Sequence, residues 1–176
     1  MKIVRDLDMK DSSKMIILRG NSGSGKTTVA DRLQKELGRG TLVISQDVIR
    51  REMLWVKDGV NTEAISLLIN LILYGKRNCK YVILEGILNA VWYKELFETI
   101  VSEFGSHIYA YYYDLPFEET LQRHKTKPNS GDFGENEMRR WWKEKDYIEF
   151  IPEKILTSQL GIDETVKMIL QDISEN

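Results

Sequence analysis

The sequence is poor in cysteine and proline, and neither sign of charge dominates it. Its 176 residues include one cysteine, Cys79, so no internal disulfide can form and the disulfide-rich secreted class is excluded. Only three prolines, with 42% hydrophobic and 30% charged residues, exclude disordered and fibrous chains. A net charge of −2 creates no overall field toward nucleic acid or an anionic membrane, so any nucleic-acid binding would have to be local.

Long hydrophobic runs are also missing. The longest are about six residues, whereas a membrane-spanning helix needs about 20. Residues 1–14 are mostly polar and charged, which does not fit a secretory signal, and we interpret them as a leader or a short edge strand. We therefore expect a cytoplasmic protein with no membrane partner, and the length predicts a single domain over residues 1–176.

One glycine-rich stretch, here called the glycine loop, carries the clearest chemical signal. Its spacing fits G-x-x-x-x-G-K-[ST], in which glycines let successive backbone N–H groups point at phosphate oxygens. Lys26 would reach the β- and γ-phosphates of a nucleoside triphosphate, and the Thr27 hydroxyl would bind Mg²⁺. An apolar strand before the loop and a helical pattern after it favour phosphate binding over a turn that binds nothing. The loop consists of Gly20, Asn21, Ser22, Gly23, Ser24, Gly25, Lys26, Thr27 and Thr28.

Short apolar segments alternate with amphipathic helical patterns along the whole chain. Strands are predicted at 15–19, 41–45, 80–86, 108–114 and near 153–156, and helices at 29–37, 47–54, 62–77, 90–104, 117–125, 135–145 and 163–173. Continuous apolar strands are typical of a parallel sheet covered on both faces. The alternation predicts a three-layer α/β P-loop NTPase fold with a mostly parallel five-stranded sheet. The loop-like segment at about 125–136 is interpreted as a short lid.

Two polar residues follow the second predicted strand, at the sheet edge where open α/β sheets bind ligands. Asp47 is the best candidate for a general base that accepts the proton of a hydroxyl group. The alternative is that Asp47 caps a helix beginning at Val48, and both roles can coexist. Arg50 lies one helical turn beyond Asp47 and could bind a polar or anionic acceptor, with Arg51 as its competitor.

Two further charged residues are expected near the same edge. Glu85 ends the third strand, as the acid of a Walker B strand does, and would hold Mg²⁺ through water or orient the attacking group. Its alternative is a strand-end carboxylate that pairs with Lys26 or is solvated. Arg123 ends the helix that enters the lid, and lid closure could bring it to the β- and γ-phosphates. Its alternative is a cation that stabilises a helix C-terminus.

The order of these segments resembles the small P-loop kinases that include phage-type polynucleotide 5′-hydroxyl kinases, zeta toxins and chloramphenicol phosphotransferase. The resemblance implies that Asp47 acts as general base, Arg50 contacts the acceptor and Arg123 stabilises the transferring phosphate. Glu85 stands where the polynucleotide kinases have an aspartate, and residues 133–142 look like an uncharacterised bacterial branch. The segments concerned are the glycine loop, Ser45-Gln46-Asp47 with Arg50, Leu84-Glu85-Gly86 with Asn89, and Asp114-Leu115-Pro116 followed by Leu121-Gln122-Arg123.

The predicted helix at 135–145 combines cations with two tryptophans. Such a helix could be a platform on which a nucleobase stacks. Interleaved acids favour the ordinary alternative, a solvated helix whose tryptophans face the core. The residues concerned are Arg139, Arg140, Lys143 and Lys145, Trp141 and Trp142, and the acids Glu135, Glu137 and Glu144.

The sequence favours an ATP- and Mg²⁺-dependent kinase that phosphorylates a hydroxyl group of a small-molecule or nucleotide-like acceptor. Lys26, Asp47 and Arg123 would be its catalytic residues, and Thr27 and Glu85 would place the metal. One alternative is a polynucleotide 5′-hydroxyl kinase, in which nucleic acid takes part only as acceptor. Another is a nucleotide-dependent switch or an ATPase. The sequence predicts neither the acceptor nor the oligomeric state.

Overall fold

The computed structural model describes residues 13–125 and 134–175. The predicted leader, up to residue 12, and most of the predicted lid therefore lie outside the described residues. Within the described ranges, no helix combines the length and the apolar character that crossing a membrane requires.

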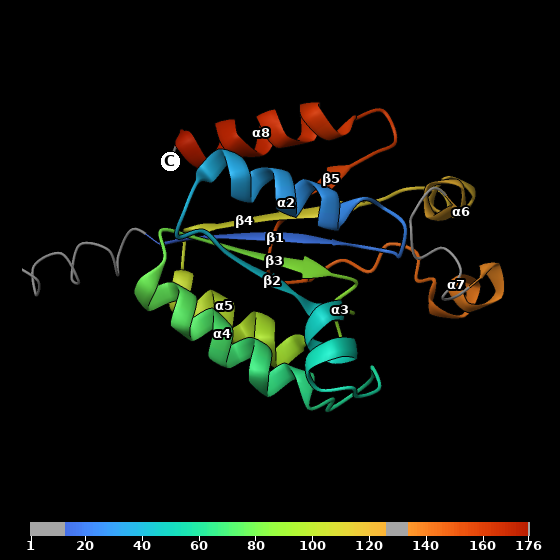
Figure 1. Ribbon diagram of the computed structural model, residues 1–176, viewed down its shortest axis with the longest axis horizontal. Coiled ribbons are helices and arrows are strands. Elements are labelled where there is room, and N and C mark those ends of the chain that lie inside the picture. Colours follow the sequence, from blue (N-terminus) through green and yellow to red (C-terminus); the bar gives the residue numbers. More distant parts are fainter. Residues whose placement is uncertain (1–12, 126–133, 176) are drawn as a thin grey trace, which may run out of the picture.

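A five-stranded sheet forms the centre of the molecule (Figure 1). Its strands lie in the order β2-β3-β1-β4-β5, and every pairing is parallel. The predicted mostly parallel, five-stranded sheet is confirmed. The strands are β1 (Lys14–Gly20), β2 (Leu42–Ser45), β3 (Tyr81–Gly86), β4 (Ile108–Tyr113) and β5 (Glu153–Leu156).

Helices cover both faces of the sheet, as Figure 1 shows. Alternate side chains of β1 point to opposite faces, so Ile16 and Leu18 pack with α2 (Lys26–Leu37) and α8 (Ile162–Ser174). Met15 and Ile17 pack on the other side, with α4 (Ala64–Asn78) and α5 (Lys94–Phe104). The central strand is therefore buried on both faces, which explains its continuous apolar run and confirms the three-layer α/β prediction.

Several helix ends follow from local sequence. Helix α2 ends before Gly38, whose φ of 88° suits glycine and whose N–H donates to the Gln34 carbonyl at 3.0 Å. Helix α6 (Phe117–Lys125) begins directly after Pro116 and has the predicted bounds. Helix α5 begins four residues later than predicted, because the Asn89 side chain accepts the N–H groups of Val91 and Trp92 in a turn.

Two helices at the carboxyl edge of the sheet differ from the prediction. The segment expected to be one helix over 47–54 is a short α3 (Gln46–Val48) followed by a π-helical turn, η1 (Ile49–Met53). Helix α7 (Glu135–Trp141) ends four residues early. Its end coincides with contacts to distant residues: the Asn21 amide exchanges two hydrogen bonds with the Lys143 backbone, at 2.8 and 3.0 Å. These tertiary bonds satisfy backbone groups that a longer helix would have paired internally.

A fully buried arginine joins the central strand to the segment after α7. Arg19 lies on the α5 face of β1 and forms ion pairs with Asp146 at 3.0 Å and Glu153 at 2.8 Å. Its guanidinium also donates to the Leu88 carbonyl and lies 5.2 Å from the ring centre of Phe97. Because a buried charge is costly unless it is paired, these contacts hold the segment from 146 to 153 against β1.

We expect Arg19→Met to destabilise the fold strongly, because it would leave the buried Glu153 without its cation and the buried Asp146 with Lys143 alone. Removal of one partner of a buried ion pair costs about 3–5 kcal/mol. Urea unfolding followed by circular dichroism would measure the free energy of unfolding.

The matched control is Arg32→Met, since Arg32 pairs with Asp163 at the surface, where both side chains are largely exposed. A surface pair contributes about 0–1 kcal/mol, so this variant should stay close to the wild type. Equal stability of the two variants would contradict the structural role of Arg19.

Candidate active site

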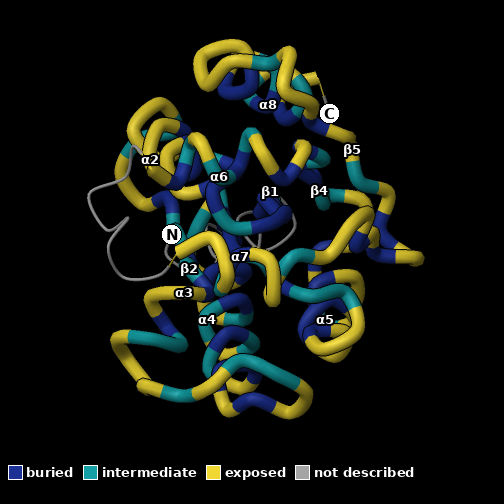
Figure 2. The backbone as a smooth tube through the Cα atoms, turned by 90° about the vertical axis from the view of Figure 1, so that its right-hand side faces the viewer, coloured by how far each residue is buried: buried dark blue, intermediate teal, exposed yellow. Residues whose placement is uncertain are grey.

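The candidate site lies at the carboxyl edge of the sheet, where the glycine loop connects β1 to α2. Figure 2 looks onto this edge and shows α6 and α7 in front of the strand ends, with α3 below them. Ligands of open α/β folds bind at this edge, because the loops that leave the strands there converge.

The glycine loop packs directly on the backbone of α6. Gly23 has a φ of 84°, and a Cβ atom there would lie 2.4 Å from the carbonyl oxygen of Thr120. Gly25 has a φ of 99°, a conformation that side-chain-bearing residues seldom adopt. The loop conformation therefore requires glycine at both positions, and α6 fixes its place relative to the sheet.

Lys26 lies over the loop and is almost completely buried. Its Nζ donates to the Asn21 carbonyl at 2.9 Å and to the Ser24 hydroxyl at 3.0 Å. Its ammonium group is thus held at the mouth of the loop, at the first residue of α2, where the helix dipole also favours an anion. These features fit a phosphate group.

Thr27 and Glu85 lie side by side, as the sequence predicts for a metal-binding pair. The Thr27 hydroxyl donates to one Glu85 carboxylate oxygen at 3.3 Å, and the Ser45 hydroxyl donates to the other at 2.5 Å. A hydroxyl beside a carboxylate provides the oxygen ligands that Mg²⁺ prefers. The described residues contain no cluster of three or more His, Cys, Asp or Glu side chains.

Asp47 lies in the first turn of α3 with its side chain 53% exposed. Arg50 pairs with its carboxylate at 2.9 Å and Arg51 at 3.4 Å, so both arginines approach the candidate base. The alternative role of Asp47 as an N-cap is wrong, because the helix begins at Gln46 and Ser45 holds the capping position.

Arg123 contacts the glycine loop from α6. Its guanidinium donates to the Ser24 carbonyl at 3.1 Å and forms an ion pair with Glu119 one helical turn away. Arg123 lies in the last turn of α6, the position expected for a cation that stabilises a helix C-terminus, and its side chain also reaches the glycine loop. The structure therefore brings Lys26, Arg123 and the loop together.

A cavity of about 470 Å³, here called the Tyr113 cavity, opens on the Gly23–Gly25 side of the loop. The Tyr113 hydroxyl is buried and has no hydrogen-bond partner among the described residues. Burial raises the pKa of this phenol, so it keeps its proton at neutral pH and can donate. The lining is Gly23, Ser24, Gly25, Thr28, Val29, Tyr113, Arg123, Leu160, Gly161, Ile162 and Thr165.

A second cavity of about 470 Å³, here called the Trp141 cavity, opens on the Gly20–Asn21 side of the loop. Cations and aromatic rings dominate its wall, together with two carboxylates. The lining is Gly20, Asn21, Arg50, Arg51, Lys57, Asp58, Ile87, Asn89, Trp92, Tyr112, Arg140, Trp141, Trp142, Lys143 and Asp146. The glycine loop thus separates two cavities of similar size.

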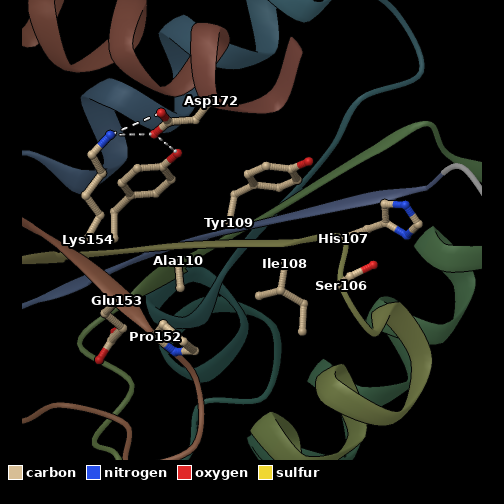
Figure 3. Close-up of a pocket in the computed structure, with 10 residues that line it drawn as sticks. Ser106, His107, Ile108, Tyr109, Ala110, Pro152, Glu153, Lys154 and Asp172 are labelled. Atoms are coloured by element: carbon tan, nitrogen blue, oxygen red, sulfur yellow. Dashed lines mark hydrogen bonds and ion pairs between the residues drawn. The ribbon is translucent and has the colours of Figure 1, made fainter. Parts of the chain in front are cut away.

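A third hollow, of about 700 Å³, lies between β4, β5 and α8 (Figure 3). There the Lys154 ammonium and the Tyr111 hydroxyl both reach the Asp172 carboxylate, at 3.0 and 2.8 Å. Its β4 residues begin at Ile108, at the opposite end of the strand from Tyr113, which pairs with Gly20. This hollow is therefore remote from the glycine loop.

Sequence reasoning missed several residues of the site. Asn21 stays a predicted residue of the phosphate loop, and the motif does not indicate that its side chain also binds the Lys143 backbone. Lys57 and Trp92 line the Trp141 cavity from segments that showed no pattern pointing to a ligand. The one signal that could have been used is Arg19, a charged residue at the end of an apolar strand, which has to find buried partners elsewhere in the chain.

Comparisons with known proteins agree on the fold. The chain resembles the APS kinase of Mycobacterium tuberculosis in complex with AMPPNP and APS, with 20% identity and a TM-score of 0.65 over 94% of this chain and 99% of that one. It also resembles a gluconokinase from Sinorhizobium meliloti, with 13% identity and a TM-score of 0.61 over 94% and 93%. A tunicamycin resistance protein of Deinococcus radiodurans matches with 18% identity and a TM-score of 0.59 over 92% and 95%.

No curated protein matched the sequence at a significant level. A family model does match, the one described as AAA domain (AAA_33), and it covers residues 15–150. This range contains the glycine loop, Asp47, Glu85, Arg123 and the wall of the Trp141 cavity. The chain has the P-loop kinase fold, and it belongs to the AAA domain family AAA_33.

Proposed function

We propose that the protein is an ATP- and Mg²⁺-dependent phosphotransferase that moves the γ-phosphoryl group of ATP to a hydroxyl group of a small-molecule or nucleotide-like acceptor. The observation that carries this proposal is the position of the glycine loop between two cavities. A phosphotransferase needs a donor on one side of the transferred group and an acceptor on the other, roughly in line. A switch or an ATPase needs one nucleotide site and water.

The donor half would be the Tyr113 cavity with the glycine loop. The nucleoside of ATP would occupy the cavity, where the unpaired Tyr113 hydroxyl offers a hydrogen bond. The loop N–H groups and Lys26 would bind the phosphates. Arg123, which already contacts the Ser24 carbonyl, would stabilise negative charge that develops on the transferring group.

Thr27 and Glu85 would hold Mg²⁺, since their oxygens meet beside the loop. When bound, the metal neutralises charge on the β- and γ-phosphates. Ser45 fixes the orientation of the Glu85 carboxylate through its hydrogen bond.

The acceptor half would be the Trp141 cavity together with Asp47, whose carboxylate pairs with Arg50 and Arg51 of the cavity wall. The acceptor hydroxyl forms its new bond to the γ-phosphorus, its proton passes to the Asp47 carboxylate, and the bond from the γ-phosphorus to ADP breaks. Arg50 and Arg51 orient that carboxylate through their ion pairs. Arg50 also lines the cavity, so it can contact the acceptor.

Kinases with the same fold support this assignment, since one of them is described in complex with an ATP analogue and its acceptor. The narrower resemblance to polynucleotide 5′-hydroxyl kinases, zeta toxins and chloramphenicol phosphotransferase stays a prediction, as does the single domain over residues 1–176. The alternative is a polynucleotide 5′-hydroxyl kinase, whose acceptor is nucleic acid. A comparison of acceptors distinguishes the two.

The experiment is a screen of nucleosides, nucleotides, oligonucleotides with a 5′-hydroxyl, amino sugars and antibiotics for acceptor-stimulated ADP release. Lys26→Ala serves as the blank, because it removes the cation of the phosphate loop. We expect one acceptor class to stimulate release by the wild type alone. Release at one rate with every compound would indicate an ATPase or a switch instead.

Once an acceptor is identified, Asp47→Asn should lower kcat by a factor of about 10²–10⁴, which is the usual contribution of a general base. ATP affinity should be unchanged. Coupled ADP assays and ATP titrations measure the two quantities. Glu98→Gln is the control, because Glu98 is an exposed carboxylate that pairs with Lys94 on α5 and lines neither cavity. Full phosphotransfer by Asp47→Asn would refute the assignment of the base.

Gly23→Ala should weaken ATP binding by about tenfold or more, because the new Cβ atom meets the Thr120 carbonyl and the backbone strain is about 1–3 kcal/mol. Gly38→Ala is its control: Gly38 also has a positive φ, of 88°, but a Cβ there meets nothing within 4 Å. We expect Gly38→Ala to lower thermal stability and to keep ATP affinity. Wild-type ATP affinity in folded Gly23→Ala would contradict the assigned donor site.

A further inference from the structure

The Trp141 cavity has a lining whose chemistry narrows the acceptor. Its five cations come from four separate parts of the chain: Arg50 and Arg51 from η1, Lys57 from the following loop, Arg140 from α7, and Lys143 from the segment after α7. Positively charged side chains that are distant in sequence thus line the same cavity. Such a concentration is typical of a site for an anion.

The carboxylates near the cavity already have partners. Asp58 accepts the Tyr93 hydroxyl at 2.6 Å and the Gly59 N–H at 3.0 Å. Asp146 pairs with the buried Arg19 and with Lys143. When the neighbours outside the wall are included, the cations Arg19, Arg50, Arg51, Lys57, Arg140 and Lys143 face the acids Asp47, Asp58, Asp146 and Glu153. Positive charge therefore remains in excess after every ion pair is counted.

The aromatic part of the wall is accessible. Trp92 is 39% exposed and Trp141 is 42% exposed, although large aromatic side chains normally gain stability by burial. Trp142 behaves differently, since its ring packs edge-on against Phe117 at 5.1 Å. The alternative in which both tryptophans of this segment face the core therefore fails for the exposed Trp141, while Trp142 is half-buried and also lines the cavity.

Charge and aromatic surface occur together at one point of the wall. The Arg51 guanidinium lies 5.9 Å from the ring centre of Trp141, and Arg51 also approaches Asp47. Indole faces bind flat rings by stacking, and guanidinium groups bind phosphate through paired hydrogen bonds. A ligand that has only one of these features would leave half of the wall without a complement.

We propose that the acceptor is a compound of nucleotide type, with a phosphate group and a flat aromatic ring of its own in addition to the hydroxyl that is phosphorylated. This inference rests on the proposed function and deepens it. The cavity volume of about 470 Å³ suits one such unit. Neutral sugars, sugar phosphates and uncharged aromatic alcohols are poorer complements.

The test compares five ligands that separate the sugar, the phosphate and the ring: ribose, ribose 5-phosphate, cytidine, cytidine 3′-monophosphate and cytidine 5′-monophosphate. Calorimetry with the full chain measures binding in the presence of saturating AMPPNP and Mg²⁺, which keeps the ligands out of the donor cavity. We expect one of the monophosphates to bind about tenfold or more tightly than either cytidine or ribose 5-phosphate, since phosphate and ring each add an interaction.

Two variants assign these preferences to the wall. Arg140→Gln should reduce the advantage of the monophosphate over cytidine, and Trp141→Leu should reduce its advantage over ribose 5-phosphate, each by about tenfold. Arg39→Gln and Trp55→Leu are matched controls, because Arg39 lies between α2 and β2 and Trp55 is 90% exposed outside the cavity wall. Both controls should keep the wild-type order of affinities.

Each outcome bears on one of the two proposals. Equal affinity for all ligands, or efficient phosphorylation of ribose, overturns the nucleotide-type acceptor. Tight monophosphate binding without any phosphorylated product supports this inference for the cavity and refutes the proposed phosphotransfer. An oligocytidylate that binds far more tightly than either monophosphate overturns the assignment of a single unit and indicates a polynucleotide acceptor.

Discussion

The pairing of one buried arginine with two carboxylates is the constraint on which the candidate site depends. Arg19 ends the apolar run of the central strand and has no exposure to water. An unpaired charge there would be prohibitively costly, so Asp146 and Glu153 have to lie beside it. These two acids fix the chain after α7, and that chain carries Lys143 into the Trp141 cavity. Arg19, the residue directly before the glycine loop, thus helps to position the part of the Trp141 cavity wall that contains Lys143.

Further contacts hold the glycine loop against the segments beside it. Asn21, within the loop, exchanges two hydrogen bonds with the backbone of Lys143, while α6 presses the Thr120 carbonyl against Gly23. The loop is therefore held from both sides by elements that also line the two cavities. The proposed donor and acceptor surfaces are thus attached to one short segment, which is the preorganisation that phosphoryl transfer needs.

Sequence patterns predicted the parts of the molecule that local chemistry decides. The five strands, the end of α2 at Gly38 and the bounds of α6 follow from apolar runs, a glycine and a proline. The proximity of Thr27 to Glu85 followed from the rule that parallel strands end at one edge. The early end of α7 could not be predicted, because the long-range bonds between Asn21 and Lys143 override helix propensity there. No local pattern indicated the π turn at Ile49–Met53. For the cavity wall, the sequence indicated Arg50 and the cations and tryptophans near residue 141, but their meeting with Lys57 and Trp92 in one cavity depends on long-range packing.

The central claim is that the glycine loop serves a reaction between two bound substrates. The most direct measurement follows the γ-phosphoryl group itself: γ-³²P-labelled ATP is incubated with the protein and a small-molecule extract, and the label is separated into inorganic phosphate and organic products. We expect the label on an organic hydroxyl compound that also binds the Trp141 cavity. Label that appears only as inorganic phosphate, at a rate the extract does not change, would contradict it.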